Sequence, residues 1–222
     1  MSDPYYSDDH VTIYHGDCLE LAELWTHADV MVTDPPYGTH DGAGHRGGYG
    51  RRQNHDTGTG AGFTIANDGT TETRDAALAL WGSRPAVVFG SPRQADPPID
   101  VAERLVWDKR RLGMNGGPWR YRHESIYVTA GFERVSDASS SIIEVFPGDQ
   151  SGHTHAKPVE LMTALVGAAP PGLIVDPFMG SGSTLRAAKD LGRKVIGVEL
   201  EEKYCEIAAN RCAQEVLFGG EA

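Results

Sequence analysis

Residues 172–204, "GLIVDPFMGSGSTLRAAKDLGRKVIGVELEEKY", contain the pattern that decides the fold. An apolar run ends in Asp176, a turn with Gly180 and Gly182 follows, and a helical pattern leads to a second apolar run that ends in Glu199. This order of strand, glycine turn, helix and strand is half of a nucleotide-binding βαβ unit. Glycines let the backbone approach a ligand closely, and an acid about 20 residues after the first strand can hold ribose hydroxyls.

The glycine turn also limits the kind of ligand. It has neither the third glycine of a dinucleotide site nor the lysine of a Walker loop. A nucleoside with a charged, phosphate-free tail therefore fits better than a pyrophosphate, and S-adenosylmethionine has this chemistry. A purely structural turn is the rival interpretation, since glycine turns between strand and helix are common.

The rest of the chain alternates apolar β-branched runs with helical patterns, which predicts an α/β domain with a mainly parallel sheet. A length of 222 residues fits a single domain over 1–222 with a real core. Strands are predicted at 11–14, 30–33, 86–89, 105–107, 125–128, 173–175 and 195–198. Helices are predicted at 18–25, 74–81, 158–167, 184–191 and 202–217.

Three blocks of the sequence resemble a known family. In order they are "VTDPPYG" (32–38), "HAKPVEL" (155–161) and "DPFMGSGST" (176–184), and they resemble the amino-methylating DNA methyltransferases of the permuted, beta-type arrangement. The blocks "GDCLELAEL" (16–24), "VWDK" (106–109) and "HESIYV" (123–128) extend this resemblance over nearly the whole chain.

The resemblance implies a Rossmann-like class I S-adenosylmethionine-dependent methyltransferase fold. Its sheet has seven mostly parallel strands with one antiparallel strand, and circular permutation places the cofactor strands last in sequence. The strands that end at Thr33 and Asp176 are then expected to be neighbours, so that both of their loops open on one edge.

The segment "DPPY" carries the expected catalysis. Asp34 and the backbone carbonyl of Pro35 can accept both protons of an exocyclic base amine, whose lone pair is otherwise delocalised into the ring. Pro35 and Pro36 fix the turn, and Tyr37 offers a stacking surface for a flipped base. Taken alone, a strand end closed by a proline turn is an equally good structural interpretation.

Cofactor roles follow from the resemblance residue by residue. Asp17 is assigned to the adenine, Glu199 to the ribose, and the other positions surround the methionine portion. The predicted cofactor-binding residues are Asp17, Cys18, Asp34, His155, Lys157, Asp176, Phe178, Gly180, Ser181, Gly182, Ser183 and Glu199. His155 and Ala156 stand where the family more often has threonine and glutamine. No metal is predicted, because His153 and His155 lack a third ligand and the reaction needs none.

The acceptor is predicted to be an amino group, since none of the three cysteines follows a proline as the nucleophile of C5-cytosine methylation usually does. Aspartate at position 34 favours adenine N6, with cytosine N4 as the alternative. An RNA or protein methyltransferase is a rival that the net charge of -11 keeps open. A binding module with a decayed active site is a second rival, against which the intact "DPPY" argues.

Double-stranded DNA is the expected partner, although composition alone makes the basic run in residues 104–124 a solvated surface. Residues 39–70 are predicted to form a mobile glycine-rich loop or basic lid, and residues 108–154 a reduced target-recognition region. The predicted DNA-binding residues are Arg46, Arg51, Arg52, Lys109, Arg110, Arg111, Arg120 and Arg122. A homodimer on DNA and a separately encoded restriction nuclease are further expected partners.

The compartment is predicted from the cysteines and from the apolar runs. Cys18, Cys205 and Cys212 have no CxxC spacing, which indicates a reducing compartment and hence the cytoplasm. No signal-peptide pattern or membrane-spanning run of about 18 apolar residues is present, so no membrane is expected as a partner.

Overall fold

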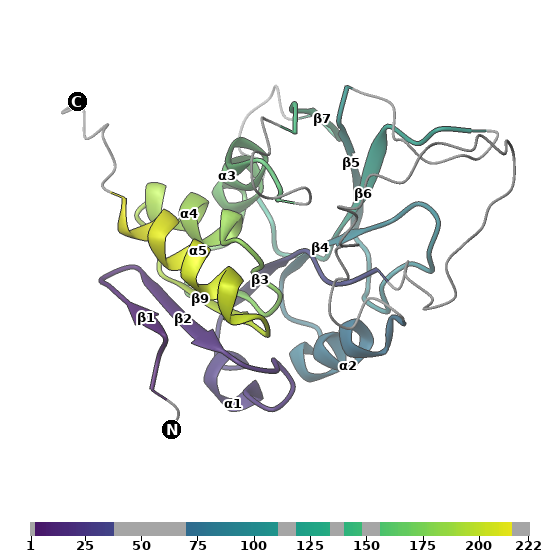
Figure 1. The fold of residues 1–222 in the computed structure, drawn as a ribbon. Coiled ribbons are helices and arrows are strands. Elements are labelled where there is room, and N and C mark those ends of the chain that lie inside the picture. Colours follow the sequence, from purple (N-terminus) through teal and green to yellow (C-terminus); the bar gives the residue numbers. More distant parts are fainter. Residues whose placement is uncertain (1–2, 38–69, 111–118, 134–139, 148–155, 215–222) are drawn as a thin grey trace, which may run out of the picture.

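A computed structural model describes residues 3–37, 70–110, 119–133, 140–147 and 156–214. All of these segments contribute to one mixed sheet with helices on both faces (Figure 1). The glycine-rich loop predicted at 39–70 lies outside the described residues except for its last residue, and parts of the region predicted at 108–154 lie outside them as well.

The sheet has the order β1-β2-β9-β8-β3-β4-β6-β5-β7 in the part of the chain that the structure describes. Its strands are β1 (Tyr6–Ser7), β2 (Val11–His15), β3 (Val30–Thr33), β4 (Ala86–Gly90), β5 (Glu103–Asp108), β6 (His123–Val128), β7 (Ile142–Glu144), β8 (Ile174–Asp176) and β9 (Val195–Glu199).

All seven predicted strands are present, as β2 to β6 with β8 and β9. Among them only β6 runs antiparallel to its neighbours, as predicted. The described residues form nine strands rather than seven, because β1 pairs antiparallel with β2 at one edge and β7 pairs parallel with β5 at the other. These two edge strands have two and three residues, too few for an alternating apolar pattern to be seen in the sequence.

Five helices cover the two faces of the sheet within the described segments. They are α1 (Ala22–Trp25), α2 (Glu72–Trp81), α3 (Val159–Gly167), α4 (Ser183–Asp190) and α5 (Glu202–Ala213). The helix predicted at 18–25 is wrong in its first half, because Asp17 to Leu21 form a turn in which the Asp17 carboxylate accepts the Leu19 amide at 2.8 Å. The last helix ends at Ala213, four residues earlier than predicted.

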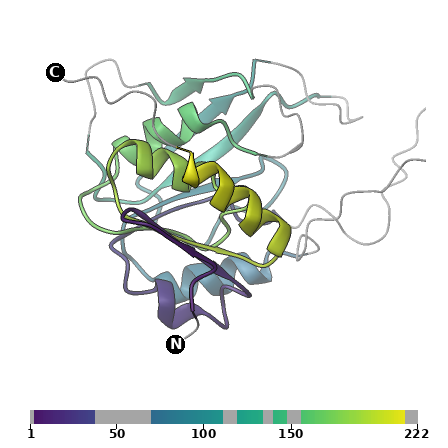
Figure 2. The ribbon, with the colours of Figure 1, turned by 60° about the vertical axis from the view of Figure 1, so that its left-hand side comes forward.

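Two apolar clusters hold the layers together. Helices α3, α4 and α5 pack on one face around Leu161, Leu185 and Ala208, while α1 and α2 pack on the other (Figure 2). On this second face the rings of Trp25 and Trp81 stack at 6.3 Å between centroids. No helix among the described residues is both long and apolar enough to span a bilayer.

Candidate active site

The proline turn and the glycine turn open on the same edge of the sheet. Strands β3 and β8 are parallel neighbours, with Val30 opposite Ile174 and Met31 opposite Val175. The Thr33 hydroxyl donates to the Asp176 carboxylate at 2.7 Å and links the two strand ends directly. The prediction that these two strands are neighbours is confirmed. Their pairing places "DPPY" beside the glycine turn, at the edge where α/β sheets bind ligands.

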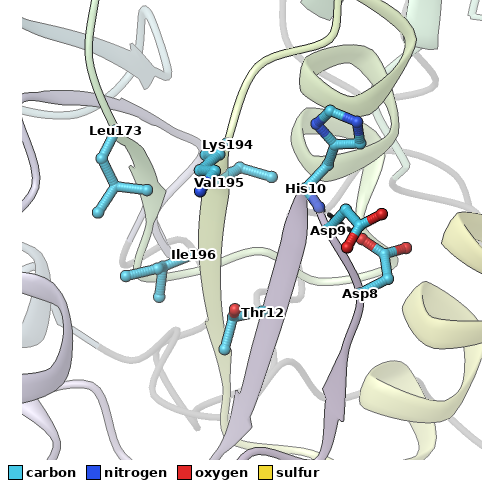
Figure 3. A pocket seen from close by; sticks show the side chains of 8 residues that line it. All are labelled: Asp8, Asp9, His10, Thr12, Leu173, Lys194, Val195 and Ile196. Atoms are coloured by element: carbon cyan, nitrogen blue, oxygen red, sulfur yellow. Dashed lines mark hydrogen bonds between the residues drawn. The ribbon is translucent and has the colours of Figure 1, made fainter.

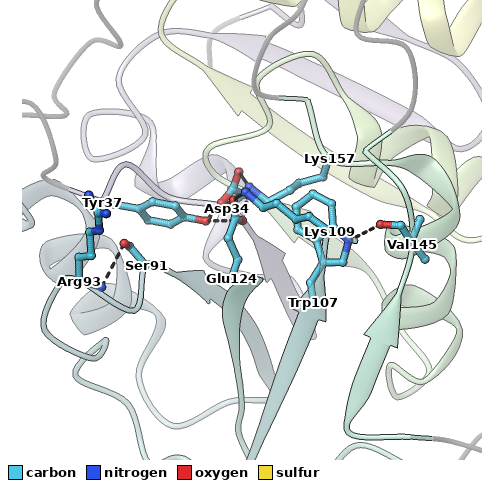
Figure 4. A network of polar contacts seen from close by, with 9 residues as sticks. All are labelled: Asp34, Tyr37, Ser91, Arg93, Trp107, Lys109, Glu124, Val145 and Lys157. Carbon is cyan, nitrogen blue, oxygen red and sulfur yellow. Dashed lines mark hydrogen bonds and ion pairs between the residues drawn. The ribbon is translucent and has the colours of Figure 1, made fainter. Parts of the chain in front are cut away.

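Two side chains donate hydrogen bonds to the Asp34 carboxylate (Figure 4). One of its carboxylate oxygens accepts a hydrogen bond from the Lys157 ammonium, and the other accepts one from the Tyr37 hydroxyl. The same ammonium lies 3.1 Å from Oε2 of Glu124, and the same hydroxyl lies 3.3 Å from that oxygen. We call Asp34, Tyr37, Glu124 and Lys157 the Asp34 cluster.

The Asp34 cluster is largely shielded from water. The exposed fraction of the side chain is 9% for Lys157, 14% for Glu124 and 28% for Asp34. Lys109 pairs with the remaining oxygen of Glu124, and the ring of Trp107 lies 5.0 Å from its ammonium and 6.0 Å from that of Lys157. Two lysines thus balance two carboxylates, as buried charges require.

The pKa shifts agree with this balance. Burial lowers the pKa of Lys157, but Asp34 and Glu124 outweigh it and the net shift is upward. Burial raises the pKa of Glu124, but Lys157 and Lys109 lower it by more, so the net pKa of this carboxyl lies below its ordinary value. Burial raises the pKa of Asp34, as does Glu124, while Lys157 opposes them. Burial together with the two carboxylates raises the pKa of Tyr37, so its hydroxyl remains a neutral donor.

Asp176 joins three elements. Its carboxylate accepts hydrogen bonds from the Thr33 hydroxyl, from the Thr184 hydroxyl at 2.5 Å, and from the Phe178 amide at 3.1 Å. The residue is only 2% exposed. It therefore fixes the ends of β3 and β8 against the start of α4, and its predicted contact with a cofactor stays a prediction.

Burial of Asp176 has a consequence for stability. Desolvation raises its pKa from 3.8 to about 6 against the opposing hydrogen bonds, so the native state holds this proton more tightly than the unfolded chain does. The contribution of this carboxyl to the free energy of unfolding is largest below pH 4, and it falls by about 3 kcal/mol as the pH rises through 6.

Asp176→Asn keeps the hydrogen-bonding shape without the charge. We expect the variant to gain stability relative to the wild type between pH 4 and pH 7, measured by urea unfolding. A difference that does not vary with pH would contradict the shift.

The glycine turn is open on one side and packed on the other. Gly180 has φ +50, and a Cβ placed there meets no atom within 4 Å. Gly182 has φ +78, and a Cβ there would lie 2.7 Å from that of Ala208 on α5. Ser183 accepts a hydrogen bond from Arg211 at 2.7 Å and so faces α5. Gly180 is therefore on the open side of the turn.

The predicted adenosine-binding residues lie at the same edge. Strands β2 and β9 are parallel neighbours, and His15 at the end of β2 lies opposite Glu199 at the end of β9. Asp17 follows His15 by two residues. The Glu199 carboxylate accepts the Gly180 amide at 3.0 Å, and its net pKa is raised by burial. The side chain of Cys18 is buried in the core, so only its backbone can serve a ligand.

Other predicted cofactor residues differ in exposure. The side chain of Phe178 is partly buried against the α1 and α2 cluster, and Ser181 is buried. Lys157 points to Asp34 and Glu124. The structure thus brings the predicted cofactor and catalytic residues to one edge, except for His155, which lies outside the described residues.

Three of the basic residues predicted to bind DNA pair with acidic side chains, and Arg120 is exposed. Lys109 is held by Glu124 inside the site, Arg110 pairs with Glu144 at 2.8 Å, and Arg122 pairs with Asp108. Arg110 and Arg122 lie at the same edge of the sheet as Asp34. Their contacts with DNA stay predictions. Arg46, Arg51, Arg52 and Arg111 lie outside the described residues.

Sequence reasoning did not assign a role to Glu124, Trp107 or Thr33. Glu124 lies two residues before Ile126 on β6, on the face that Ile126 and Val128 present to the core. A carboxylate at a core-facing strand position needs a buried cation, and this signal was available in the sequence.

The cysteines are poor nucleophiles, as expected for amine methylation. All three are buried. Burial raises the pKa of Cys18 and Cys205 to about 12 and that of Cys212 to about 11, so the reactive thiolate is scarce at neutral pH.

A separate pocket lies at the opposite edge of the sheet (Figure 3). Its lining comes from the amino ends of β2 and β9 and includes Asp8, His10, Leu173 and Lys194. Because Asp34 follows the carboxyl end of β3, this pocket takes no part in the chemistry at Asp34.

Comparisons with known proteins agree with this geometry. Residues 106–210 match the DNA methylase family model of the N6/N4 class. The chain is 28% identical to a putative methylase, YubD of Escherichia coli K12, over 89% of this chain and 88% of that protein.

Two solved structures show the fold. The M1.HpyAVI complex with SAM is 21% identical, with a TM-score of 0.60 over 92% of this chain and all of that one. PvuII DNA methyltransferase, which is cytosine-N4-specific, is 14% identical, with a TM-score of 0.66 over 97% of this chain and 90% of that one. The mixed sheet is thus the fold of these methyltransferases, and residues 106–210 resemble the N6/N4 DNA methylase family.

Proposed function

We propose that this protein transfers a methyl group from S-adenosylmethionine to the exocyclic amine of a flipped base in double-stranded DNA, with adenine N6 as the acceptor. The observation that carries the proposal is the hydrogen bond from Thr33 to Asp176 between β3 and β8. It holds the carboxylate of Asp34 beside the glycine turn, as a methyl transfer between two bound molecules requires.

The residues at the glycine turn fit the cofactor. Space is open above Gly180, and Glu199 and Asp17 follow neighbouring strands at the same edge. The related M1.HpyAVI structure is a complex with SAM. When bound, S-adenosylmethionine supplies a methyl group activated by its sulfonium.

Asp34 orients and activates the amine in this mechanism. Its carboxylate and the Pro35 carbonyl accept hydrogen bonds from the two N–H groups of the amine, which turns the nitrogen lone pair away from the ring. The nitrogen forms a bond to the methyl carbon as the carbon–sulfur bond breaks, and one amine proton then leaves through Asp34 to solvent. The ring of Tyr37 stacks on the flipped base, and charge placed ahead of the reaction supplies most of the rate.

Adenine is preferred because aspartate occupies position 34. Cytosine N4 is the alternative, and the PvuII enzyme of the same fold is cytosine-N4-specific. Several relatives are type II methyltransferases, which keeps a separate restriction nuclease among the expected partners. A homodimer on DNA and a cytoplasmic location also stay predictions.

The test is transfer of tritium from labelled S-adenosylmethionine to unmethylated plasmid DNA, followed by nucleoside mass spectrometry. We expect N6-methyladenine, and sequencing of DNA from a methylation-deficient host would then give the motif. N4-methylcytosine would establish the alternative. Label in RNA or protein, with none in DNA, would overturn the proposal.

A further inference from the structure

The acceptor oxygens of Asp34 are already occupied. Lys157 donates to one and Tyr37 to the other, so a base amine that binds to either oxygen meets a donor that is already there. The two donors and the amine therefore compete for one carboxylate. Moving a buried ammonium into an apolar environment without a partner is very costly, so Lys157 needs another acceptor close by.

Oε2 of Glu124 is such an acceptor for both donors. It lies 3.1 Å from the Lys157 ammonium and 3.3 Å from the Tyr37 hydroxyl. Each donor can thus change its main partner from Asp34 to Glu124 by a small side-chain movement. No large rearrangement of the backbone is needed.

We propose that Glu124 is a positioning residue that takes over Lys157 and Tyr37 when the target amine binds to Asp34. This inference rests on the proposed function and adds a residue to it. Glu124 itself does not touch the base in this scheme, because it acts through the two donors that it receives.

Neighbouring side chains prepare Glu124 for this role. Lys109 holds its other oxygen, which fixes the carboxylate on β6 and leaves Oε2 for the donors. The ring centroid of Phe89 lies 4.9 Å from the Lys157 ammonium, and that of Trp107 lies 5.0 Å from the Lys109 ammonium. These rings keep the lysine between the two carboxylates and favour its charged form.

A charge-neutral variant tests the proposal. Glu124→Gln keeps the shape and a carbonyl acceptor, but it leaves Asp34 as the only carboxylate for Lys157. We expect kcat to fall roughly 10- to 100-fold with unchanged cofactor affinity. Glu124→Asp keeps the charge and is expected to recover part of the rate. Asp190→Asn, in the Arg186 pair on α4, removes a carboxylate far from Asp34 and is the matched control.

The pH profile gives a readout that a structural role would not move. Glu124 raises the pKa of Asp34, so its neutralisation is expected to shift the acid limb of kcat to lower pH even as the plateau falls. Among the residues that the structure describes, the other titratable groups that face Asp34 are Lys157, Tyr37 and Asp176, and all three are unchanged in this variant.

A double-variant cycle separates the mechanism from simple loss of packing. If Glu124 acts mainly through Lys157, then Glu124→Gln should change kcat by less than about 3-fold in a Lys157→Gln background. Full activity of Glu124→Gln, multiplicative effects in the double variant, or an unmoved acid limb would each overturn the inference. A folded wild-type protein that methylates no DNA would instead overturn the proposed function.

Discussion

Asp34→Asn is expected to lower the rate of methyl transfer to DNA by about 10²- to 10³-fold, the cost of removing one preorganised electrostatic contact. The amide has one acceptor oxygen in place of two and no charge, so it stabilises the amine poorly as positive charge develops on nitrogen. Because this interaction is strongest in the transition state, the loss should appear in kcat. The rate is measured with saturating DNA and labelled cofactor.

Cofactor affinity of Asp34→Asn provides the control. Lys157 keeps Glu124 as a charged partner in this variant, so the site should stay folded and bind S-adenosylmethionine within a few-fold of wild type. Calorimetric titration measures this affinity. A rate close to wild type would exclude Asp34 as the acceptor of the amine protons. A parallel loss of affinity and rate would make Asp34 mainly a cofactor contact, a role that the sequence also allowed.

The sheet could be predicted because its strands carry a local signal. Runs such as Val30 to Thr33 and Val195 to Val198 are rich in β-branched residues and buried on both faces, with Pro35 after the first run and Gly192 before the second. The edge strands β1 and β7 depend on backbone pairing with a neighbour, which short segments do not reveal. The shortened first helix has a similar cause, since one side chain, Asp17, caps a turn within an otherwise helical pattern.

The residues of the site that could be predicted lie in short motifs of the chain. Asp34 to Tyr37 and the glycine turn each form one short motif, and both were found. Glu124, by contrast, has only the weak local signal of a carboxylate at a core-facing position of β6, and its contacts with Lys157 and Lys109 join separate parts of the chain. The sequence predicts Lys109 as a DNA contact, and its pairing with Glu124 inside the site is a tertiary contact that the basic run does not reveal.

Two glycines of the same turn should respond in opposite ways to alanine. Gly182→Ala is expected to cost about 2–4 kcal/mol of folding stability, because its backbone is left-handed and the new methyl would clash with Ala208. Gly180→Ala should cost only about 1 kcal/mol, since its Cβ meets no atom, but the methyl fills the space proposed for the cofactor. Urea unfolding and calorimetric binding of S-adenosylmethionine measure the two effects separately. If Gly180→Ala binds the cofactor as tightly as wild type, the ligand does not lie over this turn, and the methyl donor would have to approach Asp34 from another direction.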